Sequence, residues 1–458
     1  MNTILNTERT KRIESYFFTF LLYELFLGGS GRVFSFGSIT LRMILFSIAL
    51  IWFSIRIFQN PNKKFVIRMV LFFGVTVSAG ALVGILNHAP KGLIFTDIKQ
   101  LLFFLSIISF SFFLNTKEQV NKCIKILKNA TLILSLAYLI CYSFIKLNIL
   151  KMEPFYNTLS VEWLHDEFMF RGTGGNFFYK GFFYLGIGIF FYLFSKPTIK
   201  NGFIVLIIYV ALFLTLLRWL LAITLVIFAC TIFFNWAIHK FKISYLKSKQ
   251  MVFHLVIICV MILIPITFKN FYSTTLGNKQ ESVDIRKQQF DQVSAQIFNK
   301  KKPTNISKII KNEEVVKNKK IIENKEVVKT TKIIVNEEVV KTTKKFNFIF
   351  GKGFGIGVPI RPIHMELTYL EIFFKQGILG LSFWFFIFFY CIYNFKRAWY
   401  NHVDLNTILP WITGVLVIYL QSITNPLLVN SIGMSFILLA LLALRKFSEI
   451  ETKPKLSH

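Results

Sequence analysis

Long apolar runs alternate with short polar gaps along almost the whole chain. Each run is long enough, at about 1.5 Å of rise per helical residue, to cross a hydrocarbon layer of roughly 30 Å. The pattern therefore predicts an all-α polytopic membrane protein with about twelve transmembrane helices and one large loop. We place these helices at residues 16–35, 40–58, 66–87, 98–115, 128–146, 176–195, 203–217, 219–236, 251–268, 368–395, 408–424 and 429–445.

The gaps divide the chain into three parts. Residues 1–268 contain about nine of the predicted helices, residues 269–367 form the large loop, and residues 368–458 contain about three more. The first run lacks a small-residue cleavage site, so we expect it to remain as a membrane anchor.

Within the large loop, residues 305–345 repeat an apolar doublet every six residues between Lys, Glu, Asn and Thr. Steps of six drift around a helix, and in a strand each doublet places one side chain on each face. We therefore expect a low-complexity insertion that carries no chemistry. A role for its lysines in contacting glycan is the alternative.

Composition agrees with a membrane protein. Of 458 residues, 54% are hydrophobic and 54 are Phe, and the mean hydropathy is +0.56, which excludes an ordinary soluble globule. A net charge of +30 would suggest a nucleic-acid partner for a soluble protein. Here most Lys and Arg fall in gaps between apolar runs, so we expect them to orient the chain in the bilayer and expect no nucleic acid.

Basic residues cluster in every second gap, from the segment before the first span to Arg445 and Lys446 after the last. By the positive-inside rule these gaps and both termini face the cytoplasm. The opposite face then receives the 153–171 loop, Arg218 and the large loop. The candidate polar chemistry is predicted to gather on that face.

The segment that leads into the tenth run has the densest candidate chemistry. It reads GKGFGIGVPIRPIHMELTYLEIFFKQGILGL over residues 351–381. Gly353 and Gly355 belong to a glycine-rich turn whose backbone can approach a ligand closely. His364 is followed by Glu366, and histidine is the side chain suited to proton transfer near neutral pH. A single histidine is more often structural, so the surrounding residues must decide its role.

Two arginines on the same predicted face add cationic candidates. Arg171 opens the sequence RGTGGNFFYKG just before a span, and Arg218 lies inside the apolar stretch TLLRWLLAITL. A charge at the membrane centre costs about 3 kcal/mol unless it reaches water or an anion. Arg218 is therefore either a snorkelling residue that caps a turn or a clamp for a lipid-borne phosphate, which a guanidinium can bind with two hydrogen bonds.

The order of these features resembles the O-antigen ligase and O-antigen polymerase superfamily. The resemblance covers roughly residues 165–385: an Arg-Gly-Thr-Gly segment, an embedded Arg, a large outer loop, then Gly-x-Gly-x-Gly and a His before a helix with Leu-Glu-Ile and Gly-Ile-Leu-Gly. It implies a multi-pass glycosyltransferase of the bacterial inner membrane with its active site facing the periplasm. The implied donor is a glycan linked to undecaprenyl pyrophosphate, and the acceptor is the sugar hydroxyl of a glycolipid.

The resemblance also assigns roles. It implies that Arg171 and Arg218 hold the pyrophosphate, with Arg361 as a third cation and Gly353 and Gly355 in the substrate-binding turn. His364 would accept the proton of the acceptor hydroxyl or orient that hydroxyl. Glu366 would hold His364 in one tautomer, bind sugar hydroxyls or act as the base itself.

No cofactor and no metal are expected, since the predicted outer face has no Asp-x-Asp or His/Asp cluster with metal-ligand spacing. The sequence leaves open whether a partner protein regulates chain length.

Three functions remain distinct at this stage. A polymerase would pass the glycan to another lipid-linked repeat unit, and a ligase would pass it to lipid A-core. We favour the polymerase because nothing specific to ligases is seen and because Phe-rich, Lys-rich sequences are common among polymerases. The chain departs from the family at His364-Met365-Glu366, where many ligases and polymerases have His-Asn, and this departure weakens the match to ligases in particular. A secondary transporter or a lipid-linked oligosaccharide flippase would also suit the predicted spans, but the loops of a flippase are expected to be short.

Overall fold

The computed structural model describes residues 8–33, 35–36, 39–158, 167–171, 176–240, 248–267, 279–298 and 346–449. The predicted repeat at 305–345 lies outside the described residues.

Helices make up most of the described chain, and every predicted apolar run overlaps one of them. The elements are α1 (Glu8–Leu27), β1 (Ser35–Phe36), β2 (Ile39–Thr40), α2 (Leu41–Ile55), η2 (Ile57–Gln59), α3 (Lys63–Leu86), α4 (Lys91–Leu101), η3 (Leu102–Ser106), α5 (Ile107–Phe113), α6 (Lys117–Lys146), α7 (Met152–Tyr156), β3 (Phe168–Arg171), β4 (Asn176–Tyr179), η5 (Lys180–Phe182), α8 (Phe183–Leu193), α9 (Ile199–Leu214), α10 (Arg218–Lys240), α11 (Ser248–Thr267), α13 (Lys279–Phe298), α16 (Thr368–Tyr400), α17 (Leu405–Gln421) and α18 (Ser431–Ser448).

Five helical segments among the described residues are both long and apolar enough to cross a membrane. They are Lys63–Leu86, Lys91–Phe113, Lys117–Lys146, Thr368–Tyr400 and Ser431–Ser448. Six further apolar helices are shorter, between 10 and 17 residues in their apolar part. The helical content and these apolar helices fit the predicted membrane protein, whereas the number of spans stays a prediction.

The predicted helix at 176–195 is wrong over its first four residues. Asn176–Tyr179 forms strand β4, which pairs antiparallel with β3 so that Phe170 lies opposite Phe177. Aromatic side chains favour a strand and pack across the pair, with the rings of Phe168 and Phe177 stacked 4.6 Å apart between centroids. The helix begins only after this hairpin.

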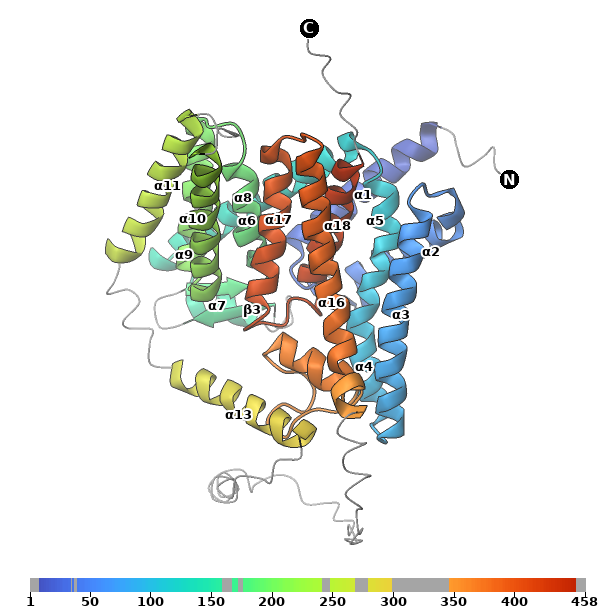
Figure 1. Cartoon of the computed structure of the whole chain (residues 1–458). Helices are drawn as coiled ribbons and strands as arrows, with labels where there is room; N and C mark the ends of the chain where they lie inside the picture. The colour runs from blue at the N-terminus through green and yellow to red at the C-terminus, as the bar shows by residue number, and fades with distance from the viewer. Residues whose placement is uncertain are drawn as a thin grey trace.

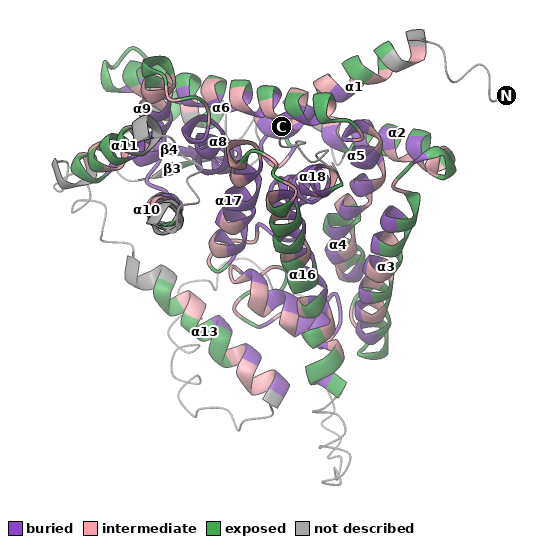
Figure 2. Ribbon diagram, turned by 45° about the horizontal axis from the view of Figure 1, so that its top comes forward, coloured by how far each residue is buried: buried purple, intermediate pink, exposed green. Residues whose placement is uncertain are grey.

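Three helices form the centre of the molecule. All residues of α8 are buried, and α17 and α18 pack against each other with most of their residues buried (Figure 2). In the most apolar window of α18, 83% of the residues are buried, compared with 33% in α3 and α16. The outer helices therefore present apolar faces outward, as helices do in lipid.

Helix α16 is broken at Gly377, whose φ of 64° and ψ of −158° are not helical. In an unbroken helix, the backbone carbonyls of Phe374 and Lys375 would accept hydrogen bonds from the N–H groups four residues later. The break leaves both carbonyls free to accept from other donors. The N–H of Lys352 donates to the carbonyl of Phe374 at 2.7 Å, and that of Gly353 donates to the carbonyl of Lys375 at 3.1 Å. The glycine-rich turn thus closes the gap in the helix that follows it.

The described elements divide between two ends of the helical body. Helix α13 and the turn before α16 lie at one end of the helical body, and the start of α1 and the end of α18 lie towards the other (Figure 1). The turn that contains His364 is therefore at an end of the bundle.

Candidate functional site

The glycine-rich turn packs tightly against α3. The N–H of Phe354 donates to the carbonyl of Gly80 at 3.0 Å. Gly353 has φ of 90°, and a Cβ there would lie 2.1 Å from the backbone nitrogen of Gly84. These glycines allow two backbones to approach each other, which fixes the start of the segment that leads to His364. Their predicted contact with substrate stays a prediction.

Asp97 of α4 connects the turn to the buried interior. Its Oδ2 accepts a hydrogen bond from the N–H of Gly355 at 2.8 Å. Its Oδ1 lies 2.7 Å from Nζ of Lys375 in α16, and both side chains are buried. The carboxylate therefore joins α4, the glycine turn and α16 in one set of contacts.

Lys375 is surrounded by three oxygens. Its Nζ lies 2.7 Å from Oδ1 of Asp97, 2.7 Å from Oε1 of Glu371 and 2.8 Å from the carbonyl of Ile363. An ammonium has three N–H donors, so all of them have an acceptor here. This arrangement offsets the cost of burying the charge.

His364 stands at the edge of this buried cluster, with 38% of its side chain exposed. Its Nδ1 lies 3.4 Å from Oε1 of Glu371, and its Nε2 lies 3.0 Å from Nε2 of Gln100. A proton on Nδ1 donates to the carboxylate and leaves a lone pair on Nε2, which the exposed amide of Gln100 can approach. In this tautomer Nε2 is the nitrogen that can accept a proton.

Glu366 belongs to a different set of contacts. Its Oε1 accepts from Arg361 at 2.7 Å and its Oε2 accepts from Arg286 of α13 at 3.2 Å. The carboxylate against His364 is therefore Glu371, and the idea that Glu366 fixes the tautomer of His364 is not what the geometry supports. Glu366 instead holds two guanidinium groups near the turn.

Helix α13 packs on the segment before α16. Gln289 accepts from the N–H of Glu366 at 3.2 Å, and Gln292 accepts from the N–H of Ile360 at 3.2 Å. A small apolar cluster joins α13 to this segment. Its buried members are Val293, Ile297, Val358, Met365 and Phe374. Part of the predicted large loop is thus an ordered helix that supports the His364 segment.

Arg218 is the first residue of α10, directly after the turn that ends α9. Leu216 in that turn has φ of 58°, and its carbonyl accepts from the N–H of Arg218 at 2.9 Å. The indole of Trp219 donates to the carbonyl of Leu420 at 3.2 Å. The apolar run around Arg218 is therefore divided into two helices at this residue. The start of α10 packs on the end of α17.

The end of α17 also contacts the start of α16. Thr368 donates to the carbonyl of Asn425 at 2.6 Å, in the connection between α17 and α18. The starts of α10 and α16 thus flank the same end of α17. Arg171, by contrast, is the last residue of β3, where it pairs with Asn176.

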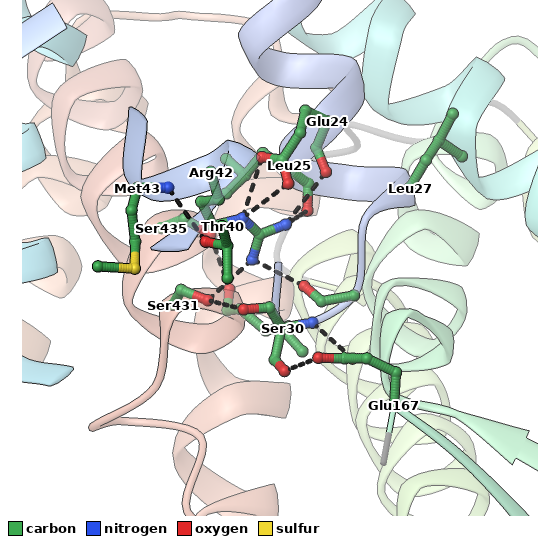
Figure 3. A network of polar contacts seen from close by, with 12 residues as sticks. Glu24, Leu25, Leu27, Ser30, Thr40, Arg42, Met43, Glu167, Ser431 and Ser435 are labelled. Atoms are coloured by element: carbon green, nitrogen blue, oxygen red, sulfur yellow. Dashed lines mark hydrogen bonds and ion pairs between the residues drawn. The ribbon is translucent and has the colours of Figure 1, made fainter. Parts of the chain in front are cut away.

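A second polar network lies around Arg42 of α2 (Figure 3). All five N–H groups of this buried guanidinium have acceptors: the carboxylate of Glu24, the hydroxyl of Ser431, and backbone carbonyls that include that of Gly29. Next to it, Ser30 donates its backbone N–H to Glu167 at 2.9 Å. The network ties α1 and α2 to α18 and to the segment before β3.

The fold also brings together a set of possible metal ligands. One ligand atom each from Asp97, His364 and Glu371 lies within 4.8 Å of the others. The sequence shows no His/Asp cluster with metal-ligand spacing on the predicted outer face, and only the fold brings Asp97 to His364 and Glu371. Lys375 already supplies positive charge between the two carboxylates, so a metal ion would compete with its ammonium for the same oxygens.

Comparison with known proteins supports the resemblance seen in the sequence. The chain is 32% identical over 200 residues to the O-antigen polymerase of Shigella flexneri. The match covers 42% of this chain and 51% of that protein, so the chain spans about half the length of the curated relative. This similarity confirms the resemblance to the O-antigen polymerase and ligase superfamily. No protein-family model and no solved structure matches the chain.

Sequence reasoning missed several residues of the candidate site in this chain. Asp97, Gln100 and Lys375 contact the His364 segment or His364 itself, and Arg286 reaches it from α13. One signal was available, because Lys375 is a charged residue inside a predicted span and such residues are rarely there without a partner. The identity of the partner depends on packing and is not visible in the sequence.

Proposed function

We propose that this protein is an O-antigen or polysaccharide polymerase. It transfers a glycan from undecaprenyl pyrophosphate to a sugar hydroxyl of another lipid-linked repeat unit. The observation that carries the proposal is the 32% identity to a protein named O-antigen polymerase. The geometry around His364 supplies a chemical basis for it.

In the proposed reaction, the acceptor hydroxyl oxygen attacks the anomeric carbon of the donor glycan. A new C–O bond forms as the bond from that carbon to the pyrophosphate oxygen breaks, and undecaprenyl pyrophosphate leaves with the bonding electrons. The hydroxyl proton passes to Nε2 of His364, whose Nδ1 faces Glu371. The acceptor hydroxyl would take the place of the Gln100 amide, which is 3.0 Å from Nε2.

Cations are required where the leaving group gains negative charge. We assign this role to Arg218 and Arg171, with Arg361 as a third cation. Arg361 bonds Glu366, so its charge is partly balanced before substrate binds. Arginine suits the task because its planar group binds phosphate oxygens with two parallel hydrogen bonds. The proposal includes no nucleotide sugar, no cofactor and no metal.

The proposed setting is the bacterial inner membrane, with about twelve spans, both termini in the cytoplasm and the active site facing the periplasm. The apolar helices and the position of the His364 turn at an end of the bundle support this setting (Figure 1). Proposed partners are the lipid bilayer, the undecaprenyl-linked donor and the acceptor glycolipid. A protein that regulates the length of the polysaccharide is a further proposed partner.

The test is a lipopolysaccharide ladder from a strain that lacks the gene, run beside the complemented strain. We expect lipid A-core that carries a single repeat unit, because ligation would survive without polymerisation. Bare core with long undecaprenyl-linked chains would instead identify a ligase. Bare core with unpolymerised units held on the cytoplasmic side would identify a flippase.

A further inference from the structure

The contacts of Lys375 converge on His364 from two directions. One N–H of the ammonium donates to the carbonyl of Ile363, the residue directly before His364. Another donates to Oε1 of Glu371, the same oxygen that faces Nδ1 of His364. A single buried cation thus holds both the backbone beside the imidazole and the carboxylate that orients it.

Asp97 fixes the position of that cation from the opposite wall. Its Oδ1 bonds Lys375, and its Oδ2 accepts from the N–H of Gly355 in the turn that leads to His364. Gln100, one helical turn further along α4, contacts Nε2 of His364. Helix α4 therefore contributes to the site although it is far from His364 in the sequence.

The charges explain why the arrangement is stable only as a whole. Two buried carboxylates, Asp97 and Glu371, share one ammonium, and their side chains are only 5% and 7% exposed. Removal of the ammonium would leave two like charges next to each other in a buried place, which strongly disfavours the observed positions. Since all three N–H groups of Lys375 have acceptors, its ammonium has no donor left for a substrate phosphate.

We infer that Lys375 and Asp97 are positioning residues for His364, which hold its backbone and its Glu371 partner in the geometry needed for proton transfer. The inference rests on the proposed role of His364 as the base. It assigns to the buried ion pair a function in the rate of glycan transfer rather than in substrate binding.

The experiment measures glycan transfer by the full-length protein in vesicles. The substrate is the lipid-linked repeat unit extracted from the strain that lacks the gene. Asp97→Asn and Lys375→Met should each lower kcat by about 100-fold, because small displacements of a catalytic group have effects of that size. KM should change by less than about threefold, since both side chains are buried and already bonded within the protein.

A double-mutant comparison separates positioning from general stability. If both residues act through His364, adding Lys375→Met to His364→Ala should not lower the residual rate further. A further loss as large as that in the wild-type background would overturn the inference. So would an unchanged kcat in both single variants.

Two controls keep the result interpretable. Size-exclusion chromatography gives the amount of folded protein in each variant. If Lys375→Met does not fold, the test rests on Asp97→Asn, because asparagine keeps an oxygen that can accept from the N–H of Gly355. Glu24→Gln is the matched control, since Glu24 forms a buried ion pair with Arg42 in the separate network. Its kcat per folded molecule should be unchanged, and a loss equal to that of Asp97→Asn would contradict the inference.

The outcomes also separate this inference from the proposed function. Full activity of His364→Ala would remove the base role itself. Loss of activity in His364→Ala together with normal kinetics of Asp97→Asn and Lys375→Met would remove only the positioning role.

Discussion

Nδ1 of His364 lies 3.4 Å from Oε1 of Glu371, a residue in the first turns of α16. Glu366, which is nearer in the sequence, bonds Arg361 and Arg286 instead. The imidazole is therefore fixed by a helix of the bundle. A residue held in this way is positioned more accurately than one that rests on its own loop.

This relationship predicts different effects for the two carboxylates. Glu371→Gln should lower glycan transfer on the order of 100-fold, because an amide supports the required tautomer of His364 less well than a carboxylate. Glu366→Gln should have a smaller effect, since it loosens Arg361 and Arg286 and leaves His364 in place. The measurement is the initial rate of transfer by each variant at equal amounts of folded protein. Equal losses would show that the geometry of Glu371 has no special role.

Arg218 should depend on the shape of its side chain as well as on its charge. Arg218→Ala should lower transfer on the order of 100-fold, as removal of a group that stabilises developing negative charge does. Arg218→Lys should be intermediate, because lysine keeps the charge but cannot form two parallel bonds to phosphate. Lipopolysaccharide ladders, normalised to membrane-inserted protein, provide the comparison. Wild-type ladders from Arg218→Ala would remove this residue from the mechanism.

The tight contact between α3 and the glycine turn should be sensitive to one methyl group. A Cβ at Gly84 would lie 2.3 Å from the carbonyl oxygen of Phe354, whereas a Cβ at Gly74 of the same helix would have nothing within 4 Å. Gly84→Ala should destabilise the protein by about 1–3 kcal/mol through overpacking. Gly74→Ala should be neutral or slightly stabilising, since alanine favours a helix. Thermal unfolding of the detergent-solubilised variants measures both, and equal Tm values would contradict the close approach.

The repeat should be dispensable. Deletion of residues 305–345 should leave the ladder unchanged, because its doublets match no helical or strand face and shortening a loop changes closure entropy only slightly. The same gels, with immunoblotting of membranes as a control for insertion, test this expectation. A well-inserted deletion variant without polymer would show that the repeat takes part in function.

The fold follows the sequence closely where the deciding forces are local. Each apolar run overlaps a helix, although the run predicted at 16–35 leaves the helix at Leu27, and the division of the run at Arg218 is the boundary between α9 and α10. The hairpin at Asn176–Tyr179 departs from this rule. Hydropathy alone cannot tell an apolar strand from the first turn of an apolar helix, and cross-strand aromatic contacts decided the outcome.

The candidate site was predictable only in part. His364 was visible because a histidine after a glycine-rich turn and before an apolar run is unusual. Asp97 and Lys375 were not visible in this way, because they are 278 positions apart and meet only in the folded chain. A buried charge indicates in the sequence that a partner exists, but not which residue it is.

The sequence by itself determined that this chain forms apolar helices with a polar turn before α16, because hydrophobic periodicity and turn chemistry act over a few residues. Only the tertiary structure decided that Glu371, and not Glu366, faces His364, and that Asp97 and Lys375 hold this pair. The reason is physical: the energy of a buried ion pair depends on distances between side chains from separate helices, and helix packing sets those distances.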